Sequence, residues 1–255
     1  MNHHIQRIYL LLIGLAAFAA AGMAHAQTLT ITNGLTLWLK ADAITGLTNG
    51  QAVSAWNDSS TNGYNATQTN ETRQPVYVTN GVAGKPVVNF AGDILETPSI
   101  GALANLSVFM VARSADLGNR YALQFGSDTR AVIQGFGPSD WRWFNTPATV
   151  TLQPMSTTIF QTIWTTNGAS SAGAWRVGAD AGVTAPFAGS IAEVLVYDHV
   201  LAPSEVVTVG GYFEQKYGVE AIPEPTTMSL LGFGAAIVLR RIFSARKRIS
   251  DRIGG

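Results

Sequence analysis

The chain has 255 residues, equal numbers of basic and acidic side chains, and no cysteine. Because the chain has no cysteine, disulfides and thiolate chemistry are excluded. His199 is the one histidine beyond residue 26. The sequence therefore offers almost no ligands for a histidine zinc site and almost no residues for a Ser/His/Asp triad. Residues 27–221 hold nine basic and fourteen acidic side chains, a net charge of about −5, which disfavours binding to nucleic acid or to an anionic polysaccharide by charge alone.

The amino-terminal end has the pattern of a secretory signal peptide. A short polar stretch ends at Arg7, and a continuously apolar run covers residues 8–21. Ala24 and Ala26 then form the small-x-small pattern that signal peptidase cleaves, so Gln27 is predicted to begin the exported protein. The alternative is that the run stays attached as a single amino-terminal anchor.

Short apolar segments, separated by glycine, asparagine, aspartate and proline, predict strands in the centre of the chain. Residues 35–40 alternate strictly, which places Leu35, Leu37 and Leu39 on one face of a strand. The other predicted strands are 86–90, 107–112, 121–125, 131–134, 141–144, 160–165, 175–177 and 191–197. Many short strands with such punctuation favour an all-β, two-sheet antiparallel sandwich or jelly roll over an α/β fold.

One helix is predicted after the last strand, over residues 203–217. Proline at its first position and Glu205 in its first turn are typical of a helix start, and Gly218 is typical of a helix end. Its apolar side chains recur at helical spacing: Val206, Val209, Phe213 and Tyr217. The internal pair Gly210 and Gly211 weakens the helix and would allow it to approach the sheet closely.

The order of these pieces resembles a laminin-G-like, concanavalin A-like jelly-roll domain of the bacterial exported type. The resemblance rests on residues 34–42, 53–60, 65–68, 84–90, 189–198 and 212–219. It implies a two-sheet antiparallel sandwich, often with carbohydrate or protein ligands and sometimes with a structural calcium ion. It implies no single activity.

Glycoside hydrolysis needs two carboxyl groups at a defined separation, and the sequence offers no good pair. The hydrolases that the fold resembles use Glu-x-Asp-x-x-Glu on one strand, and no such run exists here. Glu193 and Asp198 are close in sequence, but their odd spacing puts them on opposite faces of a regular strand. We therefore expect no enzymatic activity, and the alternative is a glycan-active enzyme with an unusual site.

Four aspartates in predicted loops are candidate ligands for a structural calcium ion, which needs six to eight oxygen atoms. They are Asp42, Asp58, Asp128 and Asp180. They form no cluster in the sequence, so the alternative is that each makes hydrogen bonds within its own turn. No other cofactor is predicted.

The densest aromatic stretch is a candidate binding site for a polysaccharide. In an extended segment Trp141 and Trp143 share one face, where they could stack against sugar rings. Asp140 and Asn145 flank them and could bind sugar hydroxyls. The alternative is that both tryptophans belong to the core, because large aromatic side chains dominate core energetics.

The carboxyl-terminal end combines a polar motif, an apolar run and a positive cluster. The two prolines that flank Glu224, Pro223 and Pro225, disfavour both a continuing helix and a central strand. An exposed extended motif is therefore expected. An apolar run over residues 228–239 follows, and then Arg240 and Arg241. The run is shorter than the ~17–25 residues usual for a spanning helix, and the positive charge marks its cytoplasmic side.

This arrangement, over residues 222–248, resembles the PEP-CTERM sorting signal of exported proteins from Gram-negative bacteria that make exopolysaccharide. The resemblance implies processing by an exosortase-type membrane enzyme, a transient anchor in the inner membrane, and final delivery to the cell surface or extracellular matrix. The alternative is an ordinary carboxyl-terminal anchor, although an anchor does not need the Pro-Glu-Pro motif.

The chain is therefore predicted to contain a signal peptide (1–26), a jelly-roll domain (27–221), a sorting signal (222–248) and a tail (249–255). We expect an exported, non-enzymatic surface or matrix protein. Its expected partners are signal peptidase, the sorting enzyme, and an extracellular polysaccharide or surface protein, with no nucleic acid.

The exported protein should begin at Gln27, because the cleavage pattern formed by Ala24 and Ala26 follows the apolar run over residues 8–21. Amino-terminal sequencing or intact mass analysis of exported material tests this expectation. An exported chain that still starts at Met1 would contradict it.

Overall fold

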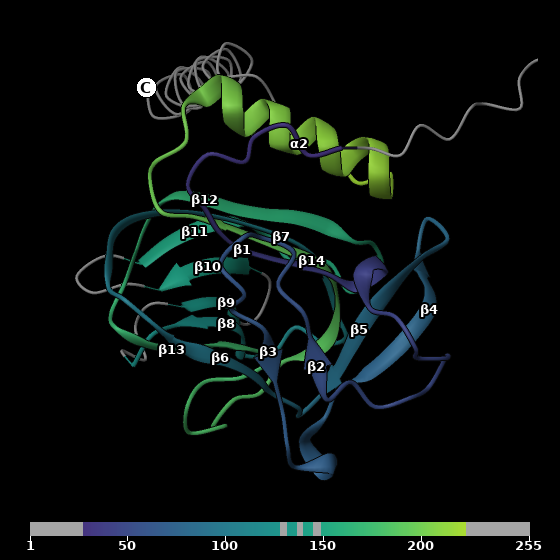
Figure 1. Cartoon of the computed structure of the whole chain (residues 1–255). Coiled ribbons are helices and arrows are strands. Elements are labelled where there is room, and N and C mark those ends of the chain that lie inside the picture. The colour runs from purple at the N-terminus through teal and green to yellow at the C-terminus, as the bar shows by residue number, and fades with distance from the viewer. Residues whose placement is uncertain (1–27, 128–131, 137–139, 145–148, 223–255) are drawn as a thin grey trace, which may run out of the picture.

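The computed structural model describes residues 28–127, 132–136, 140–144 and 149–222. The predicted signal peptide and the motif from Pro223 onward lie outside these ranges. Within them the chain folds into two antiparallel sheets and one α-helix (Figure 1). The predicted all-β sandwich with a helix after its last strand is confirmed.

The first sheet has six strands in the order β12-β7-β14-β5-β4, and β1 pairs with the other half of β14. Its strands are β1 (Leu35–Lys40), β4 (Val76–Val82), β5 (Lys85–Ala91), β7 (Leu103–Ser114), β12 (Gln161–Ser170) and β14 (Ala188–Tyr197).

The second sheet has eight strands in the order β11-β10-β9-β8-β13-β6-β3-β2. Its strands are β2 (Ala55–Trp56), β3 (Ala66–Thr67), β6 (Leu95–Ile100), β8 (Arg120–Phe125), β9 (Val132–Phe136), β10 (Asp140–Phe144), β11 (Thr149–Pro154) and β13 (Gly173–Val177). Two 3-10 turns, η1 (Ala41–Ala43) and η2 (Glu71–Arg73), lie in the connections.

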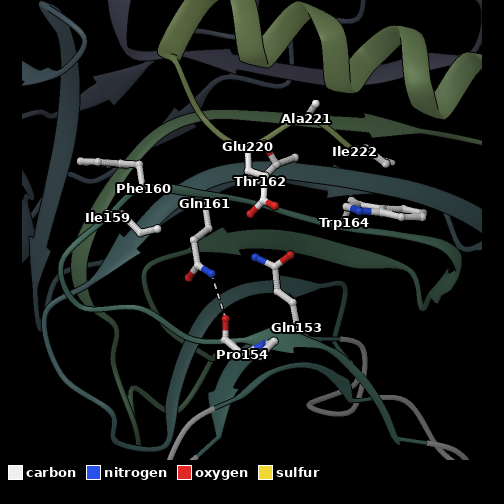
Figure 2. Close-up of a pocket in the computed structure, with 10 residues that line it drawn as sticks. All are labelled: Gln153, Pro154, Ile159, Phe160, Gln161, Thr162, Trp164, Glu220, Ala221 and Ile222. Atoms are coloured by element: carbon white, nitrogen blue, oxygen red, sulfur yellow. Dashed lines mark hydrogen bonds between the residues drawn. The ribbon is translucent and has the colours of Figure 1, made fainter. Parts of the chain in front are cut away.

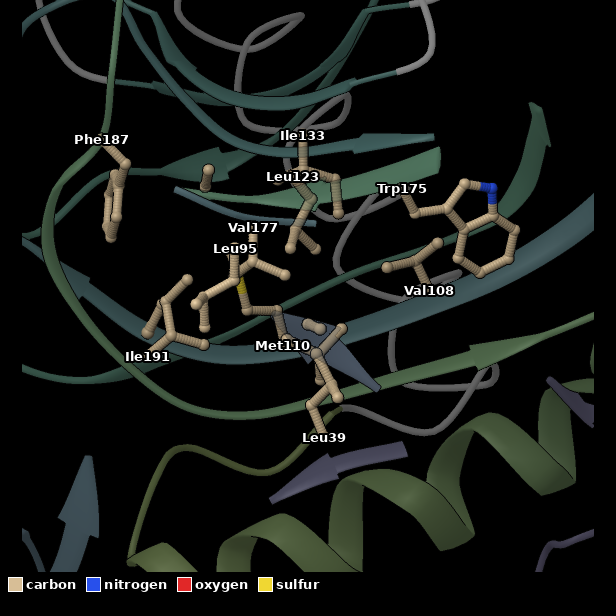
Figure 3. Packing of buried hydrophobic residues seen from close by; sticks show 14 of the residues in the cluster. Leu39, Leu95, Val108, Met110, Leu123, Ile133, Trp175, Val177, Phe187 and Ile191 are labelled. Atoms are coloured by element: carbon tan, nitrogen blue, oxygen red, sulfur yellow. The ribbon is translucent and has the colours of Figure 1, made fainter. Parts of the chain in front are cut away.

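The main core lies between the two sheets. Met110 and Ile191 from the first sheet meet Leu123, Val177 and other side chains of the second sheet there (Figure 3). Alternation along each strand supplies one apolar face to this layer. The sandwich therefore forms because both sheets bury one face against the other.

A second core lies on the outer side of the first sheet, beneath α2 (Pro203–Tyr217) (Figure 1). The helical stripe is buried as predicted, and Phe213 has no exposed surface. The backbone N–H of Ala202 donates to Glu205 at the helix start, and Gly218 ends the helix at a positive φ of 63°. Glycine adopts that left-handed conformation without steric cost.

The predicted single leucine face of β1 is wrong at one position. Leu37 and Leu39 enter the main core, whereas Leu35 packs in the core beneath α2. The register between β1 and β14 shifts between Leu35 and Leu37. This irregularity breaks the alternation of side chains between the two faces of the strand. The alternating sequence of residues 35–40 does not reveal it, because the irregularity depends on the pairing with β14.

A buried ionic cluster fixes α2 on the sheet. Glu193 of β14 has no exposed surface, and its carboxylate accepts hydrogen bonds from Trp38, Tyr212 and Tyr217. The ammonium group of Lys216 lies 2.7 Å from the same carboxylate. Burial, and then the nearby Glu193 charge, raise the pKa of Tyr212 and Tyr217 well above its ordinary value.

Truncating Phe213 to alanine should lower the free energy of unfolding by roughly 3–5 kcal/mol, because the side chain is fully buried beneath the helix. Urea unfolding of residues 27–222, followed by circular dichroism, measures this. Gln215 is exposed on the same helix, so Gln215→Ala should change the value by less than about 0.5 kcal/mol. Equal effects of both substitutions would argue against the packing of α2.

Stability should fall as the pH rises above 10, the ordinary tyrosine pKa. The folded chain keeps the phenols of Tyr212 and Tyr217 protonated at pH values where the unfolded chain ionises them, so their contribution is complete below pH 10 and is lost above it. Each such phenol contributes a slope of about 1.4 kcal/mol per pH unit. Urea unfolding at several pH values should show a shallower decline for Tyr212→Phe, and parallel declines would contradict the assignment.

Candidate functional site

The structure contradicts the predicted tryptophan platform. Trp141 and Trp143 are 0% and 1% exposed, and both point into the main core. Their rings pack 5.9 Å from Phe187 and 5.5 Å from Phe125, measured between ring centroids. The shared face of the two indoles is thus the inner face of β10, where no sugar can reach it.

The polar residues around that pair lie elsewhere. Asp140 forms an ion pair of 3.4 Å with Arg142 on the outer side of β10. Asn145 lies outside the described residues. The two-residue alternation along β10 correctly predicts which side chains share a face. It does not predict which of the two faces is buried.

The structure does not bring the candidate calcium ligands together. Asp58 accepts hydrogen bonds from the backbone N–H groups of Trp38, Ser60 and Tyr64, at 2.8–2.9 Å. Asp180 binds the backbone and hydroxyl of Thr184, both at 2.8 Å. These bonds organise loops, as expected for aspartate in turns.

The remaining two aspartates give no cluster either. Asp42 forms an ion pair with Lys216 at the margin of the buried ionic cluster, and Asp128 lies outside the described residues. Among the residues that the structure describes, no group of three or more histidine, aspartate or glutamate side chains could hold a metal ion.

Glu193 and Asp198 also serve separate purposes. Glu193 lies beneath α2, and Asp198 follows the end of β14 and contacts His199 at 3.0 Å. The carboxylate of Glu193 is enclosed by the cluster described above. It therefore stabilises the fold and is closed to a substrate.

The best candidate site is a groove at the edge of the sandwich, which we call the exit groove. It has a volume of about 370 Å³ and opens beside β11, β12 and the chain segment after α2 (Figure 2). Its lining residues are Gln153, Pro154, Ile159, Phe160, Gln161, Thr162, Trp164, Glu220, Ala221 and Ile222.

Gln161 fixes the two strands that form the floor of the groove. Its side-chain oxygen accepts bonds from Trp141 and from the backbone of Ser156, and its nitrogen donates to the carbonyl of Pro154 (Figure 2). The amide thus ties β12 to the end of β11 and to a core indole. Its hydrogen-bonding groups are used by the fold, so Gln161 is a positioning residue.

Two other polar side chains of the groove have hydrogen-bonding groups that are not used within the described ranges. Gln153 extends from β11 toward β12 (Figure 2), and its amide makes no hydrogen bond within the described ranges. The Thr162 hydroxyl also lacks a partner in the part of the chain that the structure describes. Its oxygen is covered by neighbouring atoms, so a ligand reaches it only if the side chains of the groove shift. Unpaired buried hydroxyls are uncommon and call for an explanation.

Aromatic and aliphatic side chains form the apolar part of the groove. Trp164 is half-buried and stacks on Phe109 at 6.2 Å with an interplanar angle of 11°. Phe160 is also half-buried, with the guanidinium of Arg113 5.1 Å from its ring centre. Ile159 is 60% exposed at the groove margin. No sequence pattern predicts this groove, because its lining residues come from two distant parts of the chain, 153–164 and 220–222.

Comparison with known proteins identifies the carboxyl-terminal segment. Residues 221–247 match the PEP-CTERM protein-sorting motif. The chain is thus an exported protein sorted by an exosortase-type system, with a carboxyl-terminal membrane anchor. The chain has no match among curated proteins. Within the described ranges, no helix is long and apolar enough to cross a membrane.

Comparison with solved structures finds partial similarity to parts of two glycosidases. Domain 4 of AbnA, an extracellular GH43 arabinanase from Geobacillus stearothermophilus in complex with arabinotriose, is 13% identical, with a TM-score of 0.40. That match covers 62% of this chain and 97% of the arabinanase domain.

A Trypanosoma rangeli sialidase in complex with the inhibitor DANA is 14% identical, with a TM-score of 0.40. The match covers 74% of this chain and 34% of the sialidase chain.

Proposed function

We propose that the chain is a non-enzymatic protein of the cell surface or extracellular matrix that binds a neutral polysaccharide in the exit groove. The sorting motif accounts for its export. The observation that carries the binding proposal is that one groove combines a partly exposed indole, Trp164, with the amide of Gln153, which makes no hydrogen bond to a described residue.

This combination fits a sugar chain. Pyranose rings have apolar faces that can rest on an aromatic side chain, and their hydroxyls both donate and accept hydrogen bonds. The Gln153 amide also offers both a donor and an acceptor. Ligand sites typically combine apolar walls with a few polar groups that fix orientation.

The charges of the domain favour a neutral ligand. The domain carries a net charge of about −5 by its count of ionisable side chains. Glu220 adds a carboxylate at the groove itself. An anionic polysaccharide would be repelled there, whereas a neutral one would not.

The same residues favour binding over hydrolysis. Among the described residues that line the groove, Glu220 is the one carboxylate. Glycoside hydrolysis ordinarily uses two carboxyl groups on either side of the scissile bond. A groove with one acid can hold a sugar chain without providing the general acid and base.

Gln153→Ala should weaken binding about two- to thirteenfold, because the lost hydrogen bond contributes roughly 0.5–1.5 kcal/mol. Affinity electrophoresis, with the exopolysaccharide of the host or a neutral dextran cast in the gel, measures the retardation. Gln215→Ala is the matched control, since Gln215 is exposed on α2 and does not line the groove.

Equal retardation of Gln153→Ala and the unmodified protein would refute the groove as the binding site. An assay for new reducing ends, with the same polysaccharides, tests the alternative. Release of reducing ends would establish an enzyme, and an unchanged polysaccharide that still retards the protein supports the binding role.

A further inference from the structure

The folded domain holds the chain up to the residue just before the Pro-Glu-Pro motif. Ile222 is 6% exposed and packs in the core beneath α2. A methyl group added at Gly210 would lie 2.8 Å from the Cβ atom of Ile222, closer than atoms can pack. Gly210 thus makes room for this returning segment rather than for the sheet, which corrects the expected role of the glycine pair. Gly211 has open space beside it.

The matched sorting motif therefore begins inside the folded domain. The motif starts at residue 221, and Ala221 and Ile222 both line the exit groove. The described part of the chain ends at one wall of the groove. Ile222, which lines the groove, is followed directly in the sequence by the Pro-Glu-Pro motif.

The distance from this exit to the membrane is short. Five residues, 223–227, separate Ile222 from Met228, where the apolar run begins. Fully extended, the six residue steps from Ile222 to Met228 reach at most about 22 Å. While the apolar run is in the bilayer, the groove wall must lie within this reach of the lipid surface.

The side chains around the exit suit a lipid interface. Ile159 is the most exposed of the large apolar side chains in the described ranges, at 60%. The half-buried rings of Phe160 and Trp164 line the same groove. Tryptophan and other amphipathic aromatic side chains are favoured at the level of lipid headgroups. The apolar margin of the groove and the last described residue, Ile222, thus border the same groove.

We propose that the exit groove lies against the lipid surface while the sorting segment is in the membrane, and opens to polysaccharide only after that segment is removed. The second half of this proposal rests on the proposed function. The first half requires only the groove, the packing of Ile222 and the short connection. Sorting then acts as the step that exposes the binding site.

Cysteine labelling tests the orientation directly, because the natural chain contains no cysteine. Ile159→Cys places a thiol at the groove margin. Val200→Cys is the matched control, since Val200 is 49% exposed before α2 and does not line the groove. The full chain, anchored in phosphatidylcholine vesicles, is treated with a maleimide attached to a bulky polymer.

The thiol at position 159 should react about tenfold more slowly in vesicles than in detergent, if the groove is open for a tenth of the time. The thiol at position 200 should react at similar rates in both. Equal rates for position 159 in vesicles and detergent would overturn the proposal. The labelling needs no sugar, so its failure is distinct from a failure of polysaccharide binding.

A second variant checks that the short connection causes the protection. A long Gly/Ser linker inserted between Ile222 and Pro223 behaves as a flexible coil and frees the domain to turn. The thiol at position 159 should then react as fast in vesicles as in detergent. Protection that survives the linker would mean that lipid contacts other than the tether hold the groove, and would overturn the proposed mechanism.

Discussion

The buried carboxylate of Glu193 is the interaction on which the arrangement of the carboxyl-terminal half depends. A charge without exposure costs several kcal/mol unless it is paired and hydrogen-bonded. Here Trp38, Tyr212 and Tyr217 donate to it, and Lys216 supplies the opposite charge. Three of these four partners lie on α2, so the helix satisfies the carboxylate in one position and one rotation. Apolar packing alone would tolerate sliding, whereas this pairing does not.

The position of α2 then determines where the chain leaves the domain. Gly218 turns the chain at the end of the helix, and the next residues return along its surface until Ile222 packs against Gly210. This returning segment forms one wall of the exit groove. The buried ionic cluster on β14 therefore sets the geometry of a surface site and of the connection to the sorting segment.

The sandwich supplies the other wall of the groove through two edge strands. β11 is the edge strand of one sheet and β12 is the edge strand of the other, and the two strands follow each other in the chain. Gln161 joins the two edges, and its bond to the Trp141 indole ties them to the main core. Hydrogen-bonded side chains at this point leave less of the two strand edges open to pairing with other chains.

The features that the sequence determined are those encoded within a short stretch. The sorting motif, the two-residue period of the strands and the helix over 203–217 each depend on neighbouring residues. The helix was predicted to its exact end because proline at the start, the apolar stripe and Gly218 all act locally. The all-β class followed from many such local signals together.

The tertiary structure decided everything that requires a choice between faces or between distant segments. The period of β10 gave two faces, and the packing of the two sheets determined that Trp141 and Trp143 point inward. An irregularity in pairing moved Leu35 out of the main core. The exit groove joins residues near 153–164 to residues 220–222. No local sequence pattern predicts that these two segments line one groove, because their contact depends on how α2 is held on the sheet.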